Sequence, residues 1–230
     1  MFIGTKKCNK MKRIAKQIKG WMTISFFILS VSSCIQDNFW YSGVSNGKFD
    51  GSLLEYLEAP GHSYNWDSTA LMVRHAGEEI VRIFEGNDPD LKEITFFGPT
   101  NHSIRRYMLE NEIERVADMD PTWCAAQLKR HIVKGKIYRD DVPAGKPATS
   151  GAAVGEGGKD YTTLAGNRIH LYTYKTDYNG VAEMGPVTLF GSSLDSPFGV
   201  KNFEELASTN IEPNNCVVHS LGYDFTLGNM

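Results

Sequence analysis

The first 33 residues contain no aspartate or glutamate, although the chain of 230 residues has 27 acidic and 24 basic residues overall. An apolar run at residues 21–31 and two serines follow the basic start. A basic start, a short apolar run and small residues predict a secretory signal. A permanent membrane span needs about 20 apolar residues, so an uncleaved short anchor is the weaker alternative. The cations of this segment are Lys6, Lys7, Lys10, Lys12, Arg13, Lys16 and Lys19.

The end of this segment, Val31-Ser32-Ser33-Cys34, resembles the lipobox of bacterial lipoproteins. The resemblance implies cleavage before Cys34 and a lipid on its thiol and new amino terminus. We therefore predict a lipoprotein signal peptide at 1–33, a polar tether at 34–51 and a single domain at 52–230. The location implied is the cell envelope, at the outer membrane or cell surface. Translation from Met1 or from Met11 fits the signal equally.

Removal of the signal would make the chain strongly acidic, with 17 basic residues left against the 27 acidic ones. A net charge near −10 repels nucleic acid and anionic lipid. We therefore expect no nucleic-acid partner, and contact with the membrane only through the lipid on Cys34.

Cysteine is scarce, with four residues in the chain. Cys8 lies in the signal and Cys34 is the predicted lipid site, which leaves Cys124 and Cys216. An exported compartment permits a disulfide between these two. Two buried thiols that act as small hydrophobic side chains are the equally open alternative.

Familiar catalytic patterns are also missing. The chain has no HExxH zinc motif, no GxSxG nucleophile elbow and no phosphate-binding loop at Gly145-Lys146. We interpret His131 and His219 as structural, hydrogen-bonded imidazoles, and we expect the other four histidines to face solvent. We therefore predict no enzyme activity, no cofactor and no metal site. The four histidines expected at the surface are His62, His75, His102 and His170.

The pattern of elements predicts an α+β fold. Helices are expected at residues 53–59, from a cap at Asp67 with a break at Gly77, after residue 100, and from Asp120-Pro121. Strands are expected at 92–97, 133–138, 162–165, 167–174, 186–190 and 214–227. Residues 140–160 are expected to form a mobile loop, and 194–208 a loop with one helical turn at 203–207. Helices in the first half and strands in the second are typical of α+β rather than α/β proteins.

Residues 94–104, ITFFGPTNHSI, join a strand to a helix through Gly98 and Pro99. Proline fixes its own backbone and moves the preceding residue out of the helical region. We expect Pro99 and Thr100 to fix the turn and the side chain of Asn101 to cap the helix.

Four segments in order resemble the fasciclin-like (FAS1) family: residues 94–104, 128–135, 163–167 and 214–225. The resemblance implies a β-sandwich or wedge of mostly antiparallel strands with several short helices packed on one side. It assigns Pro99, Thr100, Asn101, His131 and His219 to the family's structural motifs. The chain departs from the family at several positions, which include Gly98 in place of the usual alanine and Arg130 in place of the usual aromatic neighbour of the histidine.

The resemblance implies a non-enzymatic module for adhesion, which binds an envelope or extracellular protein or glycan. Two alternatives stay open: an envelope hydrolase or glycan-processing accessory with an unrecognised site, and a structural subunit of an outer-membrane complex.

Overall fold

A computed structural model describes residues 47–147, 154–196 and 201–230, within a compact unit that covers Asn46–Met230. The predicted signal peptide, Cys34 and nearly all of the predicted tether lie outside the described residues. The predicted α+β class is confirmed, since five helices and eleven strands are found in the described ranges. No helix in these ranges is both long enough and apolar enough to cross a bilayer.

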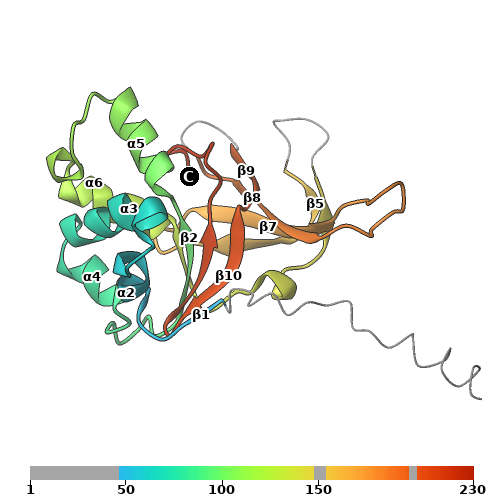
Figure 1. Cartoon of the computed structure of the whole chain (residues 1–230), viewed down its shortest axis with the longest axis horizontal. Helices are drawn as coiled ribbons and strands as arrows, with labels where there is room; N and C mark the ends of the chain where they lie inside the picture. Colours follow the sequence, from blue (N-terminus) through green and yellow to red (C-terminus); the bar gives the residue numbers. More distant parts are fainter. Residues whose placement is uncertain (1–46, 148–153, 197–200) are drawn as a thin grey trace, which may run out of the picture. The chain divides into compact units, whose positions relative to one another are not determined.

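The helices lie mainly in the first half of the unit, and the longer strands in the second (Figure 1). The helices are α2 (Leu53–Glu58), α3 (Ser63–His75), α4 (Glu78–Phe84), α5 (Asn101–Glu110) and α6 (Pro121–Arg130), with 3-10 turns at Val116–Asp118 and Arg139–Asp141. The strands are β1 (Lys48–Phe49), β2 (Ile94–Gly98), β3 (Ile132–Lys134), β4 (Gly145–Lys146), β5 (Glu156–Gly157), β6 (Lys159–Thr162), β7 (Arg168–Lys175), β8 (Val187–Ser193), β9 (Lys201–Glu205), β10 (Ser208–Pro213) and β11 (Cys216–Ser220).

Two larger sheets form the β part. One has the order β1-β10-β11-β2-β3, with parallel pairing of β1 with β10 and of β11 with β2. The other has the order β6-β7-β8-β9 and is antiparallel throughout, while β4 and β5 form a separate small pair. The prediction of mostly antiparallel strands is therefore confirmed. Because β1 pairs with β10, ordered structure begins inside the segment predicted to be a tether.

The five-stranded sheet lies between the helices and the second sheet (Figure 1). Successive side chains of a strand point to opposite faces. Accordingly, Ile94 and Phe96 of β2 pack in the core that the helices cover, whereas Phe97 packs in a second core with Ile169 and Leu171 of β7. Burial on both faces explains why apolar residues of β2 point both ways, while its one polar side chain, Thr95, is hydrogen-bonded to Gly135 and Ile137.

Local signals place several helix ends correctly. Ser52 and Glu55 form a capping box at α2, and the Asp120 side chain accepts a hydrogen bond from the Trp123 N–H at the start of α6. Gly77, with a φ of 99°, separates α3 from α4 as expected. The predicted cap at Asp67 is wrong.

Helix α3 starts earlier, at Ser63. Gly61 turns the chain at a φ of 90°, and the Nδ1 atom of His62 lies 2.6 Å from the carbonyl oxygen of Tyr56. The turn at Gly61 and the contact between His62 and Tyr56 determine where α3 begins, which is before Asp67.

The second half differs more from the prediction. The expected helical turn at 203–207 is wrong, because residues 201–205 form β9 against β8. The expected loop at 140–160 contains β4 and β5, and its residues 148–153 lie outside the described ranges. The last strand ends at Ser220 rather than near 227. Antiparallel pairing with the preceding strand, β8, overrides the helical preference of the segment FEELA.

Candidate functional site

The turn between β2 and α5 is joined to α3 by buried hydrogen bonds. Thr100 occupies the cap position of α5, but its side chain makes no capping bond. Asn101 is the first residue of the helix, and the prediction that its side chain caps this helix is wrong. Its Oδ1 atom instead accepts a hydrogen bond from the Ser68 N–H at 2.7 Å. Its Nδ2 atom donates to the carbonyl oxygens of Ser63 and Tyr64, at 2.7 and 2.8 Å.

The rest of the turn shows the same inward orientation. The Thr69 hydroxyl of α3 donates to the Pro99 carbonyl at 2.6 Å. Asn101 itself is only 2% exposed. The bonds of Pro99 and Asn101 therefore hold α3 against this turn, and the buried Asn101 amide is not open to a ligand at the surface.

His131 and His219 are both fully buried, and both contact Phe97 of β2. The Nδ1 atom of His131 lies 2.8 Å from the carbonyl oxygen of Phe97, and the Nε2 atom of His219 lies 2.8 Å from that of Ile137. A carbonyl can only accept, so these nitrogens carry the ring protons. Burial lowers the pKa of each imidazole to about 4. Both rings are therefore neutral at pH 7, and each stabilises the fold through a hydrogen bond to a backbone carbonyl.

Arg130, which replaces the family's usual aromatic residue, fixes the end of the described chain. Its Nε atom donates to the Met230 carbonyl at 2.6 Å, and its Nη2 atom donates to the Asp195 carbonyl at 3.1 Å. Phe225 supplies an aromatic contact to His131 instead, edge to face at 5.6 Å between ring centres. Arg130 thus holds the C-terminal segment through a main-chain carbonyl.

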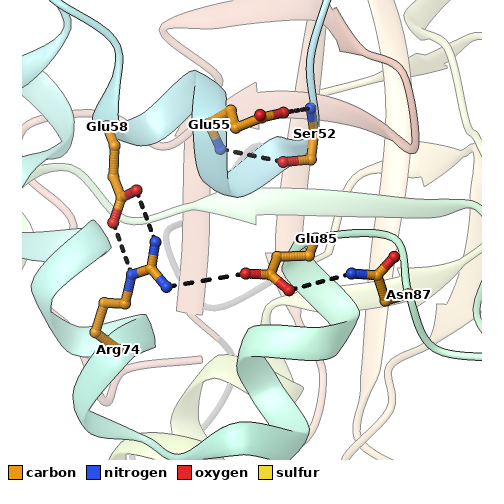
Figure 2. A network of polar contacts seen from close by, with 6 residues as sticks. All are labelled: Ser52, Glu55, Glu58, Arg74, Glu85 and Asn87. Atoms are coloured by element: carbon orange, nitrogen blue, oxygen red, sulfur yellow. Dashed lines mark hydrogen bonds and ion pairs between the residues drawn. The ribbon is translucent and has the colours of Figure 1, made fainter.

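A pocket of about 220 Å³ lies where α2, α3 and the end of α4 meet (Figure 2). Arg74 donates two hydrogen bonds of 2.8 Å to Glu58 and lies 3.9 Å from Glu85. The backbone N–H of Ser52 lowers the pKa of Glu55. A general acid needs a raised pKa near the working pH, so this pocket is better suited to joining helices than to catalysis. Its lining is Ser52, Leu54, Glu55, Glu58, Arg74, Glu85 and Asn87.

Cys124 and Cys216 are free and buried. Burial raises the pKa of Cys124 to about 11 and also raises that of Cys216. Of the two alternatives for these residues, the structure has the pair of buried thiols. Neither thiol is a reactive nucleophile, because reactivity needs a lowered pKa and access to solvent.

A histidine–aspartate pair in the second sheet was not predicted. His170 was expected to face solvent but is 8% exposed, and its Nδ1 atom lies 2.6 Å from Oδ1 of Asp160. Ser192 lies opposite His170 on the next strand, so the acid, the imidazole and a hydroxyl occupy one row. The strand register, which the hairpin at Gly166 sets, is the signal that could have found this row.

The three side chains follow the acid, histidine and hydroxyl order of a hydrolytic triad, but a substrate cannot reach them. A side-chain carbon on Gly158 would lie 2.8 Å from Nε2 of His170, so the backbone of Gly158 covers the atom that would accept the serine proton. Ser192 is itself 3% exposed. The row therefore belongs to the packing between β6, β7 and β8.

The remaining histidines are also less exposed than expected. His62, His75 and His102 are all partly buried, and His75 Nε2 lies 2.8 Å from the Met119 carbonyl oxygen. No group of three or more His, Cys, Asp or Glu side chains able to hold a metal ion occurs in the described part of the chain.

These features define an α+β module in which one mixed sheet separates a helical layer from an antiparallel sheet, and whose motif residues serve packing. A comparison of the sequence with models of known protein families identifies this class. The model of the Fasciclin domain matches residues 78–222, and the chain belongs to this family. Fasciclin domains are generally non-catalytic modules of cell adhesion.

The comparison with solved structures includes a FAS1 domain pair from the insect cell adhesion molecule fasciclin I. It is 14% identical, with a TM-score of 0.44, over 69% of this chain and 43% of that chain. The chain thus spans less than half the length of that structure. No curated protein matches this chain.

Proposed function

We propose that this protein is a non-enzymatic, lipid-anchored adhesion module of the cell envelope. The observation that carries the proposal is the match to the Fasciclin domain over residues 78–222, in a family typically involved in cell adhesion. The lipobox at Val31 to Cys34 supports anchoring through a lipid. In this proposal the anchor lies at the outer membrane or cell surface, and the partner is an envelope or extracellular protein or glycan.

The state of the candidate catalytic groups supports a non-enzymatic role. The two motif histidines are buried and neutral, with each ring bonded to a backbone carbonyl. The Asp160–His170 pair lies beneath Gly158. An active site needs a pocket in which reacting groups meet substrate, and neither place offers this.

Anchoring is tested by metabolic labelling with an alkyne fatty acid in a bacterial host that processes lipoproteins. We expect the full chain to be labelled and to sediment with membranes, and Cys34→Ala to lose both properties. Cys124→Ala is the matched control, because its thiol is buried in the domain, and it should keep the label. Equal labelling of the Cys34→Ala variant would refute the lipid anchor.

Adhesion is tested separately with cells that display the protein. Cells with the full chain should bind to envelope-coated surfaces more than cells with an empty vector. Cells with Cys34→Ala should bind no better than the empty-vector cells, because the protein is no longer held at the surface. Equal binding by all three would contradict the adhesive role.

A further inference from the structure

Three aromatic rings from distant parts of the sequence meet at the surface beside α5. The ring centre of His102 lies 6.2 Å from that of Tyr64 and 4.6 Å from that of Tyr223. Tyr64 is 72% exposed and Tyr223 is 52% exposed, while His102 is half-buried between them. We call these three residues the aromatic platform. Exposed aromatic groups of this kind often mark binding surfaces.

Side chains of α5 hold both tyrosines in place through their backbones. Asn101 donates to the Tyr64 carbonyl at 2.8 Å, and Arg106 donates to the Tyr223 carbonyl at 2.9 Å. His102 comes from the same helix. The backbone that carries each tyrosine is therefore held before any ligand arrives, which lowers part of the entropic cost of binding.

The size of the platform favours a small ligand over a protein. With about 200 Å² for a tyrosine side chain, the exposed fractions leave roughly 250 Å² of tyrosine surface. A standard protein–protein interface buries about 800 Å² on each partner. The platform alone is thus too small to hold a protein partner, but it suits one or a few rings of a ligand.

An ion pair borders the platform. Nη2 of Arg106 lies 4.0 Å from the carboxylate of Asp224, and the Asp224 side chain is fully exposed. The guanidinium offsets the charge of this carboxylate, whose oxygens are open to hydroxyl donors. The acidic chain as a whole repels polyanions.

We propose that the aromatic platform binds the sugar rings of an uncharged glycan. A pyranose ring has an apolar face of C–H bonds, which packs on the face of a tyrosine, and an edge of hydroxyls. Tyr64 and Tyr223 each supply an exposed ring face, while Asp224 and His102 supply hydrogen-bonding partners for the hydroxyls. This inference rests on the proposed adhesive function and gives its partner a chemical class.

The test is a titration of the full chain with three neutral hexasaccharides: maltohexaose, cellohexaose and chitohexaose. Binding is measured by calorimetry and by NMR of ring-labelled tyrosine. We expect at least one sugar to bind and to shift the signals of Tyr64 and Tyr223. The double variant Tyr64→Ala/Tyr223→Ala should bind at least tenfold more weakly, whereas Tyr64→Phe/Tyr223→Phe, which keeps the rings, should stay within a few-fold of the original.

Tyr178→Ala is the matched control, because Tyr178 is 61% exposed on the hairpin between β7 and β8. It should bind the sugar as tightly as the unaltered chain. Urea midpoints of all variants confirm that folding is preserved. The proposal is overturned if no hexasaccharide binds up to millimolar concentration, or if the alanine pair binds as well as the original.

The outcomes also separate this inference from the adhesive role. Cells that adhere through a protein partner, with no sugar bound, would keep the proposed function and overturn the glycan platform. Retention of an envelope protein through Tyr64 and Tyr223 would likewise overturn it. Sugar binding through the rings without adhesion would uphold the platform and refute the adhesive role.

Discussion

Replacement of Asn101 by alanine removes a buried amide that makes three hydrogen bonds to α3. Loss of a simple helix cap costs about 1 kcal/mol. Here the Ser68 N–H lies in a buried region and would lose its acceptor, which costs about 1–3 kcal/mol. The two carbonyls of Ser63 and Tyr64 also lose their donor, although these residues are exposed and water can replace it. We therefore expect Asn101→Ala to lower the free energy of unfolding by about 3 kcal/mol.

Urea denaturation followed by circular dichroism measures this loss. With a slope of about 2 kcal/mol per molar, the midpoint should fall by about 1.5 M. Asn111→Ala is the control, because the exposed Asn111 side chain donates a hydrogen bond to the Tyr107 carbonyl, and the loss of this bond should cost less than about 0.5 kcal/mol. If Asn101→Ala costs no more than Asn111→Ala, the clamp on α3 contributes nothing to stability and the reasoning fails.

Three further perturbations test the packing of the fold. Because burial lowers the pKa of His219 to about 4, against about 6.5 when unfolded, its contribution is present above pH 6.5. That contribution to the free energy of unfolding should be lost, by up to about 3 kcal/mol, as the pH falls towards 4. Urea midpoints of His219→Gln should therefore change less between about pH 7.5 and 5.5 than those of the unaltered chain. Gly98→Ala would place a methyl group 2.7 Å from the Trp66 ring and should cost about 1–3 kcal/mol. In a double-mutant cycle, Gly98→Ala should cost much less in a Trp66→Leu background, because the smaller side chain leaves room for the methyl group. Additive losses of stability would contradict the clash. Iodoacetamide should leave Cys124 and Cys216 unlabelled in the native protein and label both in urea; protection that persists in urea would indicate a disulfide.

Elements governed by local chemistry could be predicted from the sequence. Asp120 and Pro121 start α6 through a side-chain bond and a fixed backbone, both of which act within one turn. The break at Gly77 has the same local origin. The expected succession of helices in the first half and strands in the second predicted the α+β class, and the elements follow this order.

Elements that depend on partners outside their own segment could not be predicted. Residues 201–205 contain a segment of helical composition, yet β8 pairs with them as β9. His170 alternates with buried residues on β7 and was expected to face solvent, but Gly158 and its neighbours cover that face as well. Asn101 looked like a cap because the signal is local, whereas its partners lie more than 30 residues earlier in α3.

The packing of α3 against the end of β2 explains why Gly98 stands where the family usually has alanine. A side-chain carbon there would lie within 3 Å of the Trp66 ring, and Trp66 belongs to the helix that Asn101 clamps. The close approach of α3 to the end of β2 therefore requires both the absence of a side chain at Gly98 and the inward amide of Asn101. That approach also fixes Tyr64, whose carbonyl Asn101 holds, next to His102. The buried hydrogen bonds of Asn101 thus affect the surface only indirectly, because they position the backbone that carries the exposed ring of Tyr64.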